Sequence, residues 1–183
     1  MQDRFEPLVP TLRSVSHIAL TVPRLDQAID FFVTYFGADL IYQIGQFEEA
    51  DGDGMRRKLD VDPRAKLTIA MLRLGQHTNF ERFEYEALEQ ISSPPRNSDI
   101  SGHHLAFRED DIDASYEYVS SISGVTVSEG PNGVDPDSPV ASQRWFYFKT
   151  PWGMQLEMTT CPTGDDYVGL PGERTAPPTA TWR

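Results

Sequence analysis

Residues 16–22 have the sequence SHIALTV, and residues 103–108, HHLAFR, repeat its pattern of a histidine followed by alternating apolar residues. An offset of 87 residues places His17 on His104 and also places Gly37 on Gly124. No gap is needed between these two points, so a strand, a helix and a terminal glycine recur as one unit. The sequence therefore predicts two copies of a single module.

Each copy is expected to contain one helix and four strands. Helical spacing of apolar residues predicts helices at about 26–36 and 111–122, each followed by a glycine that favours a helix end. Alternation of apolar and polar residues predicts the strands. They are expected at residues 14–22, 40–44, 66–74 and 79–87 in the first copy, and at 102–108, from 125 onward, 144–149 and 154–160 in the second.

The predicted domain organisation follows from these elements and from the Pro-, Gly- and charge-rich stretches between them. It consists of an N-terminal arm (1–13), a first module (14–87), a linker (88–101), a second module (102–160) and a C-terminal tail (161–183). Two further segments, 46–62 and 129–142, are too polar or too rich in Pro, Gly and Asp for a core and are expected to be solvated loops.

Charge and composition narrow the class of partner. The net charge is −12, from 28 acidic and 16 basic residues, and this disfavours binding to nucleic acid or to an anionic membrane surface. No apolar run is long enough to span a bilayer, and no positively charged leader is apparent. The single cysteine, Cys161, excludes an internal disulfide and fits a reducing compartment, so a cytoplasmic protein is expected.

Each copy places a histidine in its first strand and a glutamate in its last: His17 with Glu81, and His104 with Glu157. Each glutamate interrupts an otherwise apolar strand, which is unfavourable unless a partner compensates the charge. Because alternate side chains of a strand face opposite ways, the apolar set can receive the helices. The opposite face then holds imidazoles and carboxylates beside small residues, as the floor of a cavity would.

Two neutral imidazoles and two carboxylates suit one divalent ion of borderline character, such as Zn, Ni, Co, Fe or Mn. Such an ion would also compensate the burial of two carboxylates. His103 has the opposite strand parity to His104 and is not expected to bind. For Glu81 an alternative stays open, because a slip of register would promote Glu84 to the same face.

The sequence resembles the vicinal oxygen chelate superfamily, which includes glyoxalase I, methylmalonyl-CoA epimerase, extradiol dioxygenases and the fosfomycin and bleomycin resistance proteins. The resemblance covers roughly residues 14–160. It depends on four motifs in order: SHIAL (16–20), FERFEY (80–85), GHHLAF (102–107) and TPWGMQLE (150–157).

The resemblance implies an α+β fold of two paired βαβββ modules, whose curved mixed sheets enclose a central metal cavity. It implies one metal ion held by His17, Glu81, His104 and Glu157. The last hairpin departs from the family pattern, because the usual acidic turn is here Thr-Pro-Trp-Gly at 150–153, although the register to Glu157 is kept.

The first functional hypothesis is a metal-dependent, glyoxalase-like lyase or isomerase acting on a small oxygenated substrate that carries a carbonyl or hydroxyl group. A metal with open positions can act as a Lewis acid and stabilise an enolate or alkoxide as it forms. A metal-bound carboxylate, Glu157 or Glu81, would then transfer the proton as the catalytic base.

Two alternatives stay open. Two histidines and one carboxylate could instead form the Fe(II) site of an extradiol-type dioxygenase, although a fourth protein ligand would occupy a position that oxygen needs. The chain could also be a non-catalytic, resistance-type binding protein. Aromatic residues that could line such a pocket, or pack between strands or subunits, are Phe83, Tyr85, Trp145 and Tyr147.

Specificity is expected to come from segment 46–62 and the tail after Cys161, since neither belongs to the repeated unit. A basic residue near the site strands could bind a substrate carboxylate. The candidates are Arg82, Arg108, Arg144 and Lys149. A homodimer is expected, with an arm or the tail crossing to the partner subunit.

Overall fold

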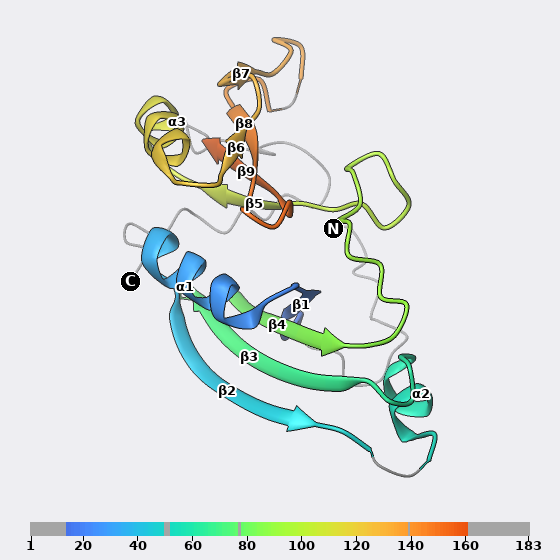
Figure 1. Ribbon diagram of the computed structural model, residues 1–183. Coiled ribbons are helices and arrows are strands. Elements are labelled where there is room, and N and C mark those ends of the chain that lie inside the picture. Colours follow the sequence, from blue (N-terminus) through green and yellow to red (C-terminus); the bar gives the residue numbers. More distant parts are fainter. Residues whose placement is uncertain (1–13, 50–51, 77, 139, 161–183) are drawn as a thin grey trace, which may run out of the picture. The chain divides into compact units, whose positions relative to one another are not determined.

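The computed structural model describes residues 14–49, 52–76, 78–138 and 140–160, and these form two compact units that divide between Gln90 and Ile91. Each unit consists of a curved mixed sheet with a helix packed on it (Figure 1). The predicted α+β class with two curved mixed sheets is therefore confirmed. The predictions for the N-terminal arm, His77, and the tail with Cys161 concern residues outside the described part.

The first unit contains a four-stranded sheet of order β1-β4-β3-β2, in which β1 runs parallel to β4 and the other neighbours are antiparallel. Its elements are β1 (Ile18–Thr21), α1 (Leu25–Phe36), β2 (Asp39–Phe47), α2 (Gly54–Leu59), β3 (Lys66–Leu74) and β4 (Thr78–Glu86). In Figure 1, α1 covers one face of this sheet, and α2 lies where β2 ends and β3 begins.

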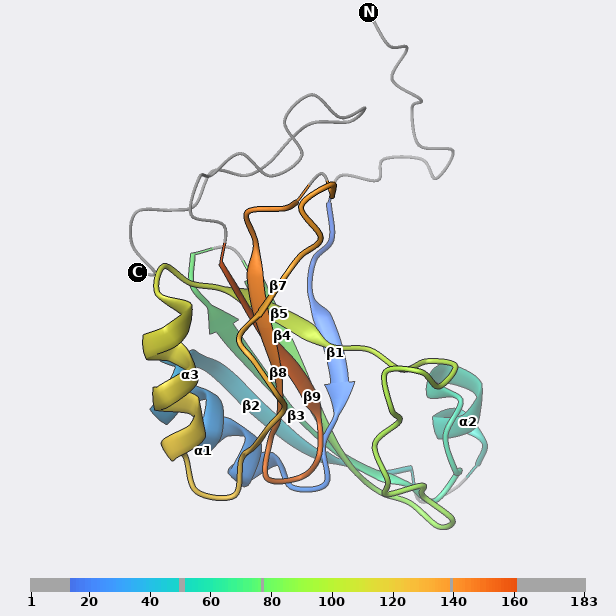
Figure 2. The ribbon, with the colours of Figure 1, turned by 90° about the horizontal axis from the view of Figure 1, so that it is seen from above.

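The second unit has the sheet order β5-β9-β8-β6, with β5 parallel to β9 and a short β7 paired to β8. Its elements are β5 (Leu105–Arg108), α3 (Ile112–Ser121), β6 (Thr126–Val127), β7 (Asn132–Gly133), β8 (Arg144–Lys149) and β9 (Gln155–Thr160). Figure 2 shows α3 running alongside β8 and β9, the two strands that it contacts most.

Equivalent strands have the same register in the two units. The 87-residue offset of the sequence maps β1 onto β5 at both ends and maps the first residue of α1 onto that of α3. The parallel pairs agree as well: Ala19 lies opposite Glu81 in the first sheet, and Ala106 lies opposite Glu157 in the second. Each glutamate thus stands at the same place in its own sheet.

The core of each unit lies between its helix and the helix-facing side of its sheet. In the first unit the fully buried rings of Phe32 and Phe80 meet edge to face at 5.1 Å. In the second, Tyr116 of α3 meets the buried ring of Phe146 on β8 at 5.1 Å. Burial of these apolar faces provides the main stabilisation and leaves the opposite side of each sheet available for other groups.

One end of each long helix follows ordinary capping chemistry, whereas α3 ends at Ile122 in an extended conformation and not at the predicted Gly124. α1 ends at Gly37, whose φ of 62° is the left-handed conformation that glycine adopts without strain. α3 begins after Asp111, whose carboxylate accepts a hydrogen bond from the backbone N–H of Ala114. Both positions agree with the predicted helices.

The prediction of solvated loops was wrong in part. Segment 46–62 contains the end of β2 and the helix α2, and segment 129–142 contains β7. In α2, the side chain of Met55 is only 5% exposed and packs with Ala65 and Leu67. A single apolar residue anchors this six-residue helix, so the average polarity of the segment concealed it. Among the described residues no helix is long and apolar enough to cross a membrane.

Candidate active site

The first predicted pair is formed within the first unit. His17 directly precedes β1, and Glu81 lies in the middle of the neighbouring parallel strand β4. The His17 Nε2 and Glu81 Oε2 atoms are 3.3 Å apart. The histidine side chain is 40% exposed and the glutamate 13%, so the pair is reachable from solvent on its histidine side.

Neighbouring polar groups hold the backbone beside His17. The Nδ2 of Asn79 donates a hydrogen bond to the Ser16 carbonyl at 3.1 Å, and Arg73 Nε donates to Asn79 Oδ1 at 2.7 Å. The Ser16 hydroxyl lies 3.3 Å from Nδ1 of His17. Nε2 is therefore the ring atom that contacts Glu81, while Nδ1 has the Ser16 hydroxyl as its neighbour. Asn79 was not among the predicted site residues, although it lies two residues before Glu81 and therefore shares its face of β4.

The second pair is formed in the second unit by the same register. His104 Nε2 and Glu157 Oε2 are 2.9 Å apart, with side-chain exposures of 35% and 15%. The ring of Tyr147 meets that of His104 at 5.0 Å and an interplanar angle of 67°. Tyr147 lies directly opposite Glu157 on the neighbouring strand β8. This single residue of β8 is therefore next to both members of the His104–Glu157 pair.

Burial determines the charge properties of the second pair. It raises the pKa of the Glu157 carboxyl above the ordinary value of 4.5, and the nearby His104 opposes this only in part. Burial and the charge of Glu157 also raise the pKa of Tyr147, so this phenol stays protonated at neutral pH. A carboxylate with a raised pKa is a stronger base than an exposed one once it is ionised.

The structure therefore brings the four predicted residues together as two pairs, one in each unit. In neither unit do the described residues include a group of three or more His, Cys, Asp or Glu side chains that could hold a metal. His103, which was not expected to bind, points its Nδ1 to the Ser101 carbonyl at 3.0 Å.

Arg82 and Glu84 are the two polar residues that made the strand register of β4 uncertain in the sequence. Both lie on the helix-facing side of the sheet. Glu84 accepts a hydrogen bond from the backbone N–H of Leu25 in α1. Arg82 is fully buried against the rings of Phe32 and Phe80. Glu81 consequently faces the other side of the sheet, and Glu84 is not its alternative.

The other basic candidates divide between the two faces. Arg144 donates two hydrogen bonds to Asp113 of α3, at 2.7 and 2.9 Å, and so belongs to the helix-facing side with Arg82. Arg108 and Lys149 lie opposite Thr159 and Gln155, which share the strand parity of Glu157. Of the four basic candidates, only Arg108 and Lys149 therefore lie on the same face of the sheet as Glu157, where a substrate anion could bind.

The donor atoms suit a divalent cation. Two ligands bound to one ion at about 2.1 Å and at right angles lie about 3 Å apart. The Nε2–Oε2 separations of 3.3 Å and 2.9 Å in the two pairs are close to this value. Each pair also combines an imidazole nitrogen with a carboxylate oxygen, a set of donors that borderline metals bind. Each pair thus offers one nitrogen and one oxygen donor at a spacing that a single cation could bind.

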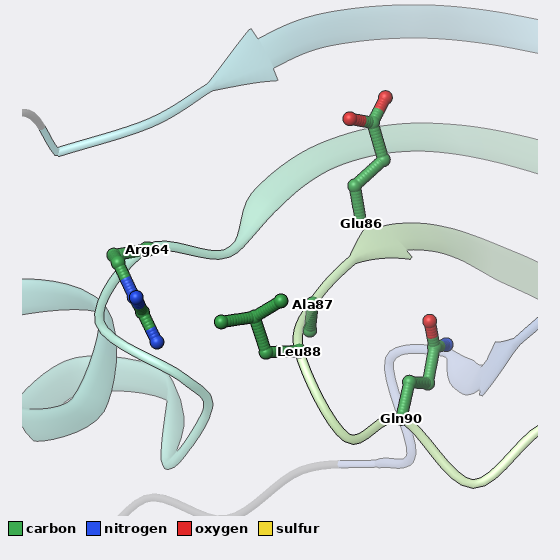
Figure 3. A pocket seen from close by; sticks show the side chains of 5 residues that line it. All are labelled: Arg64, Glu86, Ala87, Leu88 and Gln90. Atoms are coloured by element: carbon green, nitrogen blue, oxygen red, sulfur yellow. The ribbon is translucent and has the colours of Figure 1, made fainter.

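A pocket of about 450 Å³ lies elsewhere in the first unit. Figure 3 shows its lining side chains, which come from the segment before β3 and from the end of β4 and the residues after it. They are Arg64, Glu86, Ala87, Leu88 and Gln90. Neither His17 nor Glu81 lines this pocket.

Comparison with known proteins identifies the class. Residues 16–141 match the model of the glyoxalase/bleomycin resistance protein/dioxygenase superfamily. A glyoxalase family protein from Bacillus cereus is similar in structure, with a TM-score of 0.65 and 17% identity, covering 85% of this chain and 98% of that chain. The fosfomycin resistance protein FosX from Listeria monocytogenes, in a complex with Mn(II) and sulfate, has a TM-score of 0.50 and 18% identity, with 81% and 93% covered. The chain belongs to this superfamily, as its sequence predicted.

A curated relative is more informative about activity. The 2-epi-5-epi-valiolone epimerase from an Actinomyces species is 48% identical over 174 residues, which is 95% of this chain and 93% of the relative. Similarity of this extent supports an enzyme of the isomerase type within the superfamily. The prediction of an enzyme is confirmed, and of the predicted lyase and isomerase classes the isomerase is the one supported.

Proposed function

We propose that the chain is a metal-dependent epimerase that inverts a carbon next to the carbonyl group of a small polyhydroxylated cyclic ketone. The observation that carries the proposal is the pair of His–Glu contacts at equivalent places in the two sheets, 3.3 and 2.9 Å long. The substrate class comes from the Actinomyces relative, whose name gives 2-epi-5-epi-valiolone as its substrate.

In this proposal His17, Glu81, His104 and Glu157 are the ligands of one divalent ion, Zn, Ni, Co, Fe or Mn. When bound, the ion supplies Lewis-acid stabilisation of negative charge on a substrate oxygen. The support from this chain is the mixed nitrogen and oxygen donor set and the separation of the donors within each pair. The complex of FosX with Mn(II) makes Mn(II) a reasonable first ion to test.

Glu157 is the proposed proton acceptor. Its carboxylate takes a proton from the carbon next to the carbonyl and acts as the general base. Return of a proton to the opposite face of the same carbon gives the epimer, with no gain or loss of atoms. Glu81 is the second proposed proton carrier, because removal and return on opposite faces require a second group unless one carboxylate reaches both.

The test is hydrogen exchange in D₂O. With 2-epi-5-epi-valiolone and Mn(II), we expect the wild-type protein to incorporate one deuterium at the inverted carbon, detected by NMR. The Glu157→Gln variant keeps the shape of the side chain but removes the base, so exchange should fall by at least about 100-fold. Absence of exchange in the wild type with each of the five metals would refute the proposal. Oxygen uptake by the Fe(II) form would favour the dioxygenase alternative instead.

The remaining parts of the proposal concern partners and location. The net charge of −12 argues against a nucleic-acid partner, and the single cysteine fits the cytoplasm. A homodimer is supported by the edge strand β2, which exposes Ile41, Ile44 and Phe47. Light scattering during size-exclusion chromatography would measure the mass of the assembly, and a monomer at all concentrations would contradict this part.

A further inference from the structure

Strand β8 carries four aromatic residues, and the fold uses only two of them for its core. Phe146 and Phe148 are fully buried on the helix-facing side. Trp145 and Tyr147 alternate with them and point to the opposite face, where both are half-buried. Two large aromatic side chains that the core does not need are thus left on the face that holds Glu157.

These two residues form a continuous aromatic surface next to the His–Glu pair. The ring centroids of Trp145 and Tyr147 are 5.0 Å apart, with an interplanar angle of 56°. Tyr147 in turn contacts the His104 ring at 5.0 Å. In the sheet, Tyr147 lies opposite Glu157 and Trp145 lies opposite Thr159. The aromatic surface therefore begins at the pair and extends away from it along β8.

The equivalent place in the first unit is different. There Met71 lies opposite Glu81, and Ile69 lies opposite Phe83. Both β3 residues are aliphatic, and Ile69 and Phe83 pack against the buried cluster that contains Met55 of α2. The module can therefore be built with aliphatic residues at these two positions. The first unit has its own aromatic pair on this face, Phe83 and Tyr85 at 5.9 Å, but these rings lie on β4 and pack against the cluster that contains Met55. The pair on β8 instead lies opposite the strand of the glutamate and contacts the histidine ring, and among the described residues no such packing role explains it.

We propose that Trp145 and Tyr147 are the surface on which the substrate ring stacks, and that they select a polyhydroxylated ring over an open-chain ketone. The C–H face of such a ring is apolar while its edge carries hydroxyl groups, which suits a large aromatic surface flanked by a few polar groups. Gln155 and Thr159 flank Glu157 on the same face of β9 and supply an amide and a hydroxyl group for that edge. This inference depends on the proposed function for the class of substrate.

The test compares ring and open-chain ketones by calorimetry, which does not require turnover. The probes are 2-epi-5-epi-valiolone and dihydroxyacetone. We expect Trp145→Leu and Tyr147→Leu each to weaken binding of the ring ketone by about tenfold, and Trp145→Phe and Tyr147→Phe to weaken it by less than about threefold. Binding of dihydroxyacetone should change by less than twofold, about the scatter of such measurements. Tyr118→Leu, on the exposed side of α3, is the matched control and should leave both unchanged.

A second measurement uses folded protein without any change to the aromatic surface. The chain has three tryptophans, so a Trp152→Phe, Trp182→Phe double variant leaves Trp145 as the only indole. Its emission should move to shorter wavelength when the ring ketone is added. An unchanged emission, or equal losses for both ketones in the leucine variants, would overturn the inference. Normal stacking results without deuterium exchange would instead refute the proposed epimerase and leave the inference standing.

Discussion

Glu84 of β4 accepts a hydrogen bond from the backbone N–H of Leu25, the first residue of α1, with an N–O distance of 2.5 Å. The N-cap residue of this helix, Arg24, contributes no side-chain hydrogen bond to the helix end. A carboxylate from the sheet therefore does what an N-cap side chain usually does, and its negative charge lies favourably at the helix N-terminus. The contact also fixes α1 to the strand that carries Glu81.

Replacing Glu84 should therefore destabilise the first unit. We expect Glu84→Ala to lower the free energy of unfolding by about 1 kcal/mol, the usual effect of losing a helix cap. Glu84→Gln keeps an acceptor and should lose less. Chemical denaturation would measure both, with Glu48→Ala at an exposed position as the control. Equal stability of Glu84→Ala and the wild type would show that the contact contributes nothing.

In contrast to Glu84, removal of the charge of Arg82 is not expected to destabilise the protein. Its guanidinium is fully buried, with Nε and one terminal nitrogen lacking any hydrogen-bond partner, and burial lowers its pKa well below the ordinary value. The group lies over the Phe80 ring, 2.8 Å from its centroid. A methionine of similar length removes the buried charge, so Arg82→Met should be as stable as the wild type or more stable by about 1–4 kcal/mol.

The shape of the side chain should matter as much as its charge. Arg82→Ala leaves a cavity and should lose about 2–4 kcal/mol relative to Arg82→Met. Arg57→Met, at an exposed position of α2, is the control for the same replacement on the surface. Thermal and chemical denaturation would compare the variants. A methionine variant much less stable than the wild type would mean that the guanidinium makes stabilising contacts.

Much of the fold was predictable because its signals are local. The alternation from Lys66 to Leu74 and from Arg144 to Lys149 gave strand bounds that agree with β3 and β8. Gly37 marked the end of α1 through its left-handed conformation. By contrast, α2 was not predicted, because its one buried residue, Met55, is fixed by contacts with Ala65 and Leu67 that no local pattern shows.

The two His–Glu contacts were only partly predictable. Strand parity favoured Glu81 but left a slip to Glu84 open, and the parallel register of β1 and β4 in the structure is what sets Glu81 beside His17. The contact of Tyr147 with His104 was missed, because it depends on the register of the last hairpin. The roles of Glu84 and Arg82 were also missed, since a charged residue on a helix-facing side suggested a register error and not a cap or a buried cation.

Glu157 should make the stability of the metal-free protein depend on pH. A carboxyl group whose pKa is raised in the folded state contributes stability at low pH, and this contribution is lost as the pH rises through the raised value. Glu157→Gln cannot ionise. We therefore expect its melting temperature, relative to the wild type, to be higher at about pH 7 than at about pH 4. Groups that do not contact Glu157 titrate alike in both proteins and cancel in the difference, and comparing both proteins in a His104→Ala background removes the contribution of the contacting imidazole.

At neutral pH, added Mn(II) should make the melting temperature of the wild type higher than that of Glu157→Gln. The cation compensates the charge of Glu157 in the wild type, whereas glutamine is a weaker ligand. The wild type should gain more in melting temperature than Glu157→Gln when the ion is added after removal of the chelator. If the difference in melting temperature between the two proteins is the same at both pH values, the assigned burial of Glu157 is contradicted. If the ion raises both melting temperatures equally, the assignment of Glu157 as a metal ligand is contradicted.

Four single variants test whether His17, Glu81, His104 and Glu157 bind one ion. If they do, an alanine at any of the four should weaken binding by at least about tenfold, because each supplies one of only four protein ligands. Elemental analysis of protein purified without chelators would give the bound metal per chain. The rise in melting temperature with added Mn(II) would report the same loss independently. His103→Ala is the matched control, since His103 contacts the Ser101 carbonyl and should leave the metal content unchanged. Loss in only the His104 and Glu157 variants would place the ion in the second unit alone and exclude the other pair.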